Sequence, residues 1–233
     1  MQKNNRRQFF RHSGLFLAGA ALPVQNLFAG NIITGQKLPE EEVSPNEDLM
    51  REHGVLKRVL LVYQEIIDRI NRGSDFPPET VIASANIIRS FIEDYHEKLE
   101  ENYLFPRLKK ADTLVALVGV LTIQHQKGRI VTENVLSLKK SNFRSEDEKK
   151  QLQSYLDSFI RMYSPHEARE DTVLFPAFKQ VVSQNEYDSL GEEFEAQEHK
   201  LFGEDGFELM VDKVEGIEKT LGIYDLSQFT PEG

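Results

Sequence analysis

Two stretches of the chain combine histidine with glutamate at a spacing suited to metal binding. They cover residues 96–106 and 166–176, and both read His-x-x-x-Glu-acid-x-x-Leu-Phe-Pro. Residues four apart lie on the same face of a helix, so each stretch directs an imidazole and a carboxylate toward one point. The candidate metal ligands in the two stretches are His96, Glu100, His166 and Glu170.

A single histidine precedes each stretch. His53 and His125 are 72 residues apart, and the two stretches themselves are offset by 70 residues. A nearly constant offset of this length indicates an internal structural repeat. The repeated unit would be a helical hairpin, with the single histidine on its first helix and His-x-x-x-Glu on its second. Two hairpins form a four-helix bundle, a fold that holds metal sites between facing helices.

The helices that must position these residues can be traced in the apolar pattern. Apolar side chains recur at intervals of three and four residues around each histidine, as they do in helices that pack in a bundle. Capping and proline signals place the expected helix starts at Ser44-Pro45, Pro77-Pro78, Asp112 and Ser145. Pro106 is expected to kink or end the second helix, and Pro165 either kinks the fourth helix or divides it in two.

The sequence therefore predicts an all-α fold, an antiparallel four-helix bundle with two extra C-terminal helices. The bundle is expected over residues 45–183, after a linker at residues 30–44. Two further helical patterns follow, and residues 184–233 are expected to form a C-terminal helical extension that packs on the bundle.

Residues 1–29 look like an export signal. Residues 6–11, Arg-Arg-Gln-Phe-Phe-Arg, resemble the twin-arginine motif of bacterial Tat substrates. The alternative is an N-terminal membrane anchor, but polar residues and a proline interrupt the uncharged residues 13–33. We expect the Tat machinery to export the protein to the periplasm or otherwise out of the cytoplasm, with no membrane insertion once the signal is removed.

Composition excludes several classes of site and partner. The chain has no cysteine, which rules out disulfides, iron–sulfur clusters and thiolate zinc sites. Its formal net charge is −10, and residues 1–29 carry four basic and no acidic side chains, so the remainder is more acidic still, at −14. An acidic body of this kind is a poor partner for nucleic acid or an anionic membrane.

One histidine on each of four helices needs an explanation. Each unpaired polar group buried in a bundle costs a few kcal/mol, and a shared cation satisfies all of them at once. Four histidines and two glutamates are too many ligands for one tetrahedral zinc. Two carboxylates that can bridge suit a pair of metals, and imidazole with carboxylate suits iron. Ferritin-type bundles use Glu-x-x-His on two helices, and here only Glu93 to His96 has that order.

The chain resembles the hemerythrin family at these residues, in particular bacterial HHE cation-binding domains, over roughly residues 46–180. The resemblance implies an antiparallel four-helix bundle around a non-haem di-iron centre that binds dioxygen. It further implies that Glu100 and Glu170 bridge the two irons and that the histidines are terminal ligands. The expected oxygen pocket, which would keep water from the bound gas, is formed by Leu104, Phe105, Leu174 and Phe175.

The sequence departs from the family at one ligand. Hemerythrin has a His-x-x-x-His pair on its third helix, whereas Arg129 stands four residues after His125 here. His199, on the first extra helix, is a candidate replacement. Glu97 and Glu167, which adjoin the ligand histidines, are competing candidates. His12 lies in the expected signal and is not a site residue.

The predicted function is that of an exported di-iron protein that binds dioxygen or a similar diatomic molecule for carriage, storage or sensing. The alternatives are a di-iron oxidoreductase that acts on peroxide or nitric oxide, and an iron or metal storage protein. The sequence has no flavin or nicotinamide motif, so a reductant for an enzyme must come from elsewhere. We therefore favour a metal- and oxygen-binding protein over an enzyme.

Overall fold

A computed structural model describes residues 43–141, 143–203 and 206–231, and over these residues the chain is helical without a β-strand. The expected all-α class is confirmed. The expected export signal at residues 1–29, and nearly all of the linker at residues 30–44, lie outside the described residues. None of the helices described has the length and apolar character that crossing a membrane requires.

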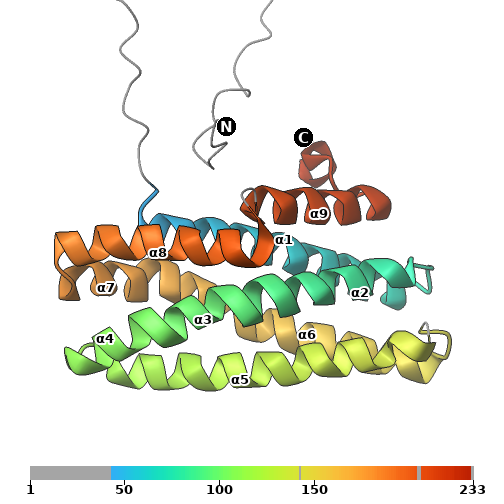
Figure 1. Ribbon diagram of the computed structural model, residues 1–233. Coiled ribbons are helices and arrows are strands. Elements are labelled where there is room, and N and C mark those ends of the chain that lie inside the picture. The colour runs from blue at the N-terminus through green and yellow to red at the C-terminus, as the bar shows by residue number, and fades with distance from the viewer. Residues whose placement is uncertain (1–42, 142, 204–205, 232–233) are drawn as a thin grey trace, which may run out of the picture.

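Four antiparallel rods form the bundle, each running opposite to the one before it (Figure 1). The first rod is α1 (Pro45–Asn71), and the third is α5 (Val115–Ser137), which continues into the 3₁₀ turn η4 (Leu138–Ser141). Each rod packs against two others, because α1 contacts α2 and α6, and α5 contacts the same two helices from the other side.

The second and fourth rods are continuous runs that alternate α-helix with π-helix. The second comprises α2 (Pro78–Ile87), η2 (Ile88–His96), α3 (Glu97–Leu99), η3 (Glu100–Leu104) and α4 (Phe105–Lys110). The fourth comprises α6 (Glu146–Arg169), η5 (Glu170–Leu174) and α7 (Phe175–Val181). π-Helical turns are rare and occur mostly at functional sites. Here one begins at each glutamate of the two His-x-x-x-Glu pairs.

The two prolines do not break their rods. We expected Pro106 to kink or end the second helix, yet the rod continues to Lys110, because Pro106 falls in the first turn of α4, just after the π-helical segment. A proline in a first turn removes no hydrogen bond that the α-helix needs. Pro165 lies inside α6, which is a single helix through that point, so the division into two helices is excluded.

The expected helix starts are confirmed at both serines. The Ser44 side chain accepts a hydrogen bond from the Glu47 backbone, and Ser145 forms a reciprocal capping box with Glu148. The start expected at Asp112 is wrong. Residue Leu114 precedes α5 instead, without a side-chain cap, and both Asp112 and Leu114 adopt the left-handed conformation, with φ of 51° and 52°.

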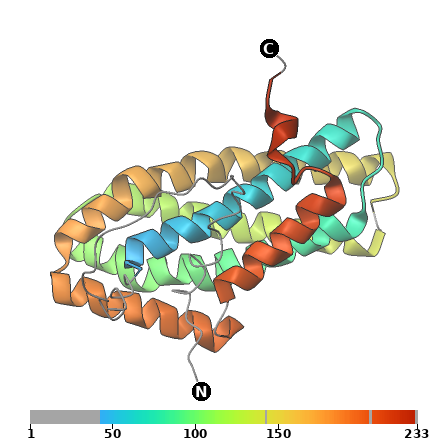
Figure 2. The ribbon, with the colours of Figure 1, turned by 90° about the horizontal axis from the view of Figure 1, so that it is seen from above.

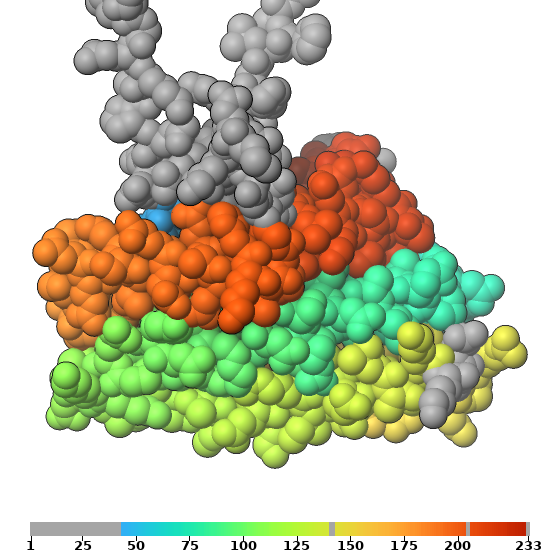
Figure 3. Space-filling model, viewed as in Figure 1, coloured from blue at the N-terminus to red at the C-terminus, as the bar shows by residue number. Residues whose placement is uncertain are grey.

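Two further helices cover one side of the bundle. They are α8 (Gln184–Phe202) and α9 (Gly206–Leu221), and a 3₁₀ turn, η6 (Leu226–Phe229), follows. Seen from above, α9 crosses over the bundle beyond the end of α8 (Figure 2). The space-filling view shows α8 against the second rod (Figure 3), where the ring of Phe194 packs against Tyr103. The last residues do not add to the core, since Leu226 remains 80% exposed.

Candidate metal centre

The six ligands expected from the repeat meet in the middle of the bundle. All six side chains are buried, and each of the four rods contributes at least one of them. Their ligand atoms fall into two overlapping groups, each within 4.8 Å. One group is His53, His96 and Glu100, and the other is Glu100, His125, His166 and Glu170.

The four imidazoles form two pairs, and within each pair the two rings face each other through their Nε2 atoms. The Nε2 atoms of His53 and His96 are 3.0 Å apart, and those of His125 and His166 are 3.3 Å apart. Two nitrogens bound to one metal at about 2.1 Å lie roughly 3.0–3.4 Å from each other. Each pair therefore has the separation of two ligands on a shared metal ion. Both members of a pair come from one hairpin of the repeat.

The other ring nitrogen of each histidine is held by an oxygen. The Nδ1 atoms lie 2.7 to 3.2 Å from Asp171 for His53, Glu52 for His96, Glu101 for His125 and Gln124 for His166. These oxygens only accept, so each Nδ1 donates its hydrogen and each neutral ring keeps an Nε2 lone pair directed at the centre. Such outer partners orient metal-binding histidines. Four neutral rings arranged in this way could all be satisfied by a bound cation.

The two glutamates lie between the histidine pairs. An Oε2 atom of Glu170 is 3.4 Å from Nε2 of His53 and 3.0 Å from Nε2 of His166. Glu100 similarly lies 3.9 Å from His96 and 3.4 Å from His125. Each carboxylate thus reaches one histidine of each pair. A cation held by either histidine pair would therefore lie within reach of both carboxylates.

Burial and charge perturb these groups strongly. Burial lowers the pKa of His53, but hydrogen bonds to Asp171 and Glu170 outweigh it and raise that pKa to about 9. Burial holds the pKa of His96 well below its usual value and raises that of Glu100 well above it. Burial also opposes ionisation of Glu170, yet its contacts with His166 and His53 lower its pKa. Without a metal, protons must balance the charges of the centre.

Comparison with known proteins agrees with this geometry. Residues 44–177 match the Hemerythrin HHE cation binding domain. The chain belongs to the hemerythrin HHE family. Uncharacterized proteins of Mycobacterium tuberculosis (strain ATCC 25618 / H37Rv) and Mycobacterium bovis are each 51% identical to it over 196 residues, which is 83% of this chain and 77% of each relative. No solved structure shows a significant match.

Two of the candidates for an additional ligand in this HHE domain are engaged elsewhere. Glu97 accepts a hydrogen bond of 2.6 Å from the Tyr163 hydroxyl and forms an ion pair of 2.6 Å with Arg129. Glu167 forms an ion pair of 2.8 Å with Lys57. Arg129, four residues after His125, forms ion pairs with Glu97 and Glu101 and so neutralises carboxylates around the centre.

His199 does not join the six converging ligands. Its side chain is 30% exposed, and its Nε2 lies 3.9 Å from Glu195 on the same helix. The buried residue of this turn is its neighbour Glu198, which accepts a hydrogen bond from the Phe207 backbone. Among the described residues, His199 belongs to none of the groups of metal-ligating side chains that converge.

The four apolar residues expected to line an oxygen pocket are buried beside the histidines. Phe105 stacks on His125 and Phe175 stacks on His53, each with ring centroids 5.5 Å apart. Leu104 and Leu174 are fully buried in the core. The two phenylalanines exclude water from one side of each histidine pair.

The outer partners of the histidines were missed by the sequence reasoning. The signal was present, because Glu101 and Asp171 occupy the acid position of the repeated stretch, and Glu52 and Gln124 directly precede the single histidines. They can be recognised when the comparison of the two repeats includes the residue before each single histidine and the residue after each glutamate.

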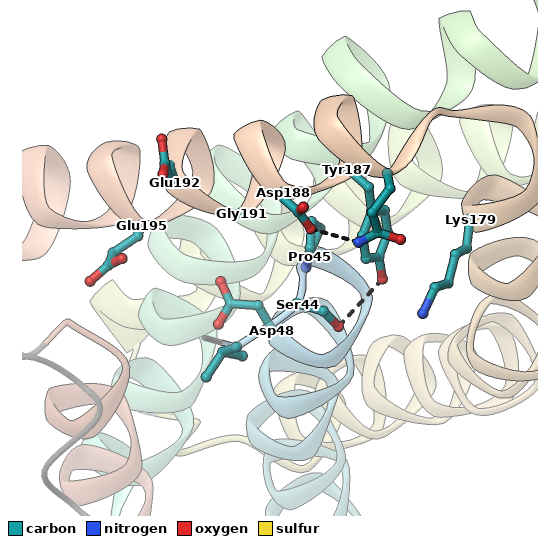
Figure 4. A pocket seen from close by; sticks show the side chains of 11 residues that line it. Ser44, Pro45, Asp48, Lys179, Tyr187, Asp188, Gly191, Glu192 and Glu195 are labelled. Atoms are coloured by element: carbon teal, nitrogen blue, oxygen red, sulfur yellow. Dashed lines mark hydrogen bonds between the residues drawn. The ribbon is translucent and has the colours of Figure 1, made fainter. Parts of the chain in front are cut away.

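A surface pocket of about 210 Å³ lies apart from the centre, between the start of α1 and α8 (Figure 4). The Tyr187 hydroxyl donates to Ser44 across it at 3.3 Å. Its rim is acidic, with Asp48, Asp188 and Glu192 among the lining residues. None of the six converging residues lines this pocket, so it is not the opening of the candidate metal centre.

Proposed function

We propose that this HHE domain is a non-haem di-iron protein that binds dioxygen or a similar diatomic molecule. The observation that carries the proposal is the arrangement of two histidine pairs with a glutamate reaching across from each hairpin. Four lone pairs and two buried carboxylates fit a pair of divalent or trivalent cations better than one ion.

Each metal position has a simple donor set. His53 and His96 would hold one iron, and His125 and His166 the other, with Glu100 and Glu170 shared between them. Two imidazoles and two carboxylate oxygens leave positions open on an iron that prefers six ligands. An iron pair supplies electrons for reversible binding of dioxygen. The protein supplies neutral nitrogen donors and a dry, aromatic wall at Phe105 and Phe175.

Iron content and colour test the proposal. Protein loaded with ferrous iron without air should contain about two irons per chain, as the donor set requires. It should gain a visible absorption band in air and lose it under vacuum. His199→Ala is the matched control and should retain both the iron and the band. A single tetrahedral zinc in the native protein, or iron that oxidises without a reversible band, would contradict oxygen carriage.

One buried residue favours an oxidoreductase as the second candidate. Tyr163 lies beside His166, with ring centroids 5.2 Å apart, and its hydroxyl donates to Glu97. A phenol so close to the centre could pass electrons during reduction of peroxide or nitric oxide by an external reductant. Sustained turnover of peroxide by the native protein, lost in Tyr163→Phe while the air-dependent band survives, would favour this function.

Export is part of the proposal and rests on residues 6–11. We propose that the Tat machinery recognises Arg6 and Arg7 and delivers the protein to the periplasm. Changing both to lysine should leave the protein in the cytoplasm, because the arginine pair is read by a receptor. Normal export of that variant would point to another route. As a control, the variant retained in the cytoplasm should contain as much iron as the native protein, which shows that the change affects export alone.

A further inference from the structure

We infer that the two metal positions differ in metal affinity. The difference arises because the Nδ1 atom of His166 is hydrogen-bonded to the amide of Gln124, whereas that of His96 is hydrogen-bonded to the carboxylate of Glu52. The inference rests on the proposed two-metal function. It concerns affinity and charge at the two positions, and it does not depend on which gas the centre binds.

The repeat makes the two positions nearly symmetric. Phe175 stacks on His53 and Phe105 on His125 at the same centroid distance of 5.5 Å and at interplanar angles of 20° and 21°. The cations that stand four residues after the single histidines, Lys57 and Arg129, pair with equivalent glutamates. The symmetry extends beyond the ligands.

Charge breaks the symmetry at one pair of outer partners. His53 is held by a carboxylate of Asp171, and His125 by a carboxylate of Glu101. The remaining two histidines differ, because His96 has the carboxylate of Glu52 and His166 has the amide of Gln124.

A carboxylate makes a bound histidine a stronger donor than an amide does. A hydrogen bond from Nδ1 to a carboxylate is charge-assisted and raises the basicity of Nε2. The bond from His96 to Glu52 is 2.7 Å long and fully buried, whereas that from His166 to Gln124 is 2.9 Å and partly exposed.

The other histidine of the second pair also has a weakened partner. Glu101 lies 3.2 Å from Nδ1 of His125, and it forms ion pairs with Arg129 at 2.7 Å and with Lys98 at 2.5 Å. Its negative charge is shared among these groups. Both histidines of the first pair therefore donate more strongly than their counterparts in the second pair.

The position at His53 and His96 should fill first and hold the more highly charged ion. Changes in outer partners shift metal affinity by about 10- to 100-fold, and replacing an amide by a carboxylate at one of two histidines belongs at the lower end. We expect about a 10-fold difference between the two steps of binding. In a state with one ferric and one ferrous ion, the ferric ion should occupy the first position.

Titration of the metal-free protein with Co²⁺ alone, followed by calorimetry and visible absorption, tests the inference. Native protein should bind two ions in steps that differ about 10-fold. Gln124→Glu should raise the affinity of the second binding step and so make the two affinities more similar. Glu52→Gln should lower the affinity of the first binding step, which also makes the two affinities more similar. The double swap, E52Q with Q124E, should restore two separate steps in reversed order.

Removal of one histidine identifies each step. His53→Ala should abolish the tight step in native protein, and His166→Ala should abolish it in the double swap. Gln151→Glu is the matched control, because it adds the same charge at an exposed position of α6, fifteen residues before His166. It should leave the ratio unchanged. Circular dichroism of each metal-free variant checks folding, and Glu52→Gln carries the test by itself if Gln124→Glu does not fold.

Two results would overturn the inference. They are equal affinities in the native protein, and a ratio that neither Gln124→Glu nor Glu52→Gln changes. Either one leaves the two-metal proposal intact, because two ions would still bind. Binding of fewer than two ions by the native protein would instead overturn the proposed function together with the inference.

Discussion

His53 is the residue at which a proton and a metal compete. Its Nε2 faces that of His96 at 3.0 Å, and hydrogen bonds to Asp171 and Glu170 raise its pKa to about 9 despite its burial. In the metal-free protein, His53 is therefore protonated at neutral pH. A metal ion that binds there must displace this proton.

Metal affinity should accordingly rise with pH. Because the pKa of His53 in the metal-free fold is about 9, Co²⁺ affinity should increase about tenfold per pH unit between pH 6.5 and 8.5 for one displaced proton. Calorimetry at pH 7 in buffers of different ionisation enthalpy should show proton release. Affinity that does not vary with pH would contradict the assignment.

The stability of the metal-free fold should change with pH in the opposite direction to the metal affinity. The pKa of His53 is raised above its ordinary value of 6.5, so its protonation stabilises the metal-free fold fully below pH 6.5. That contribution is lost as the pH rises toward 9. Urea unfolding of the metal-free protein across this range offers an independent check on the same pKa.

Single residues differ in how well the sequence predicts them. The six converging ligands were predictable because the repeat fixes both their type and their helix face. His199 lies outside the repeated stretches, and only the structure shows that it joins none of the converging groups. Gln124 and Glu52 were overlooked because neither residue type suggests a metal site until the histidine it contacts is known.

Helix–helix packing near the centre depends on one glycine of α5. A Cβ atom at Gly128 would lie 2.0 Å from the Tyr163 hydroxyl oxygen. The Tyr163 ring, which belongs to α6, therefore occupies the space that a side chain at residue 128 would need. The same hydroxyl is bonded to Glu97. The close approach of α5 and α6 thus also orders the outer network of the second metal position.

Gly128→Ala should therefore destabilise the protein despite the better helix propensity of alanine. Overpacking typically costs about 1–3 kcal/mol in the free energy of unfolding. Gly119→Ala on the same helix is the matched control, because nothing lies within 4 Å of the added Cβ, and it should stabilise by about 0.5–1 kcal/mol. Urea unfolding measures both. Equal effects of the two substitutions would rule out the steric explanation.

At the scale of elements, the periodic pattern predicted the four rods well and their irregularities poorly. Serine caps act locally, so Ser44 and Ser145 were correct. The start of α5 depends on the left-handed residues Asp112 and Leu114, which no local signal marked. The π-helical turns that begin at Glu100 and Glu170 were also not predicted, although both fall at the same place in the repeated stretch, just before Phe-Pro.

All four rods meet at the candidate metal centre, since each contributes at least one of the converging side chains. Without metal, protons on groups such as His53 must take the place of the cation. A ligand that binds only the folded state stabilises it by about 2.7 kcal/mol at a concentration 100 times its dissociation constant. Metal binding should therefore control the stability of the molecule.

Chelation should lower the thermal midpoint by several degrees, as expected for about 2–3 kcal/mol in a chain of this size. Thermal circular dichroism with and without a chelator, followed by readdition of Co²⁺, measures the change. A variant with His53→Ala and His166→Ala provides the control, because its midpoint should not respond to the chelator. An identical midpoint for loaded and metal-free native protein would contradict the linkage.

The two hairpins share their glutamates, and this has an evolutionary consequence. Each hairpin supplies one complete histidine pair, and each sends one carboxylate, Glu100 or Glu170, toward a histidine of the other. Two identical hairpins related by a twofold axis would therefore build the same centre as a homodimer. Such an ancestor could not give its two metals different neighbours, because every residue would occur twice. Duplication and fusion of the two copies into one chain would remove that constraint and allow positions such as Glu52 and Gln124 to differ.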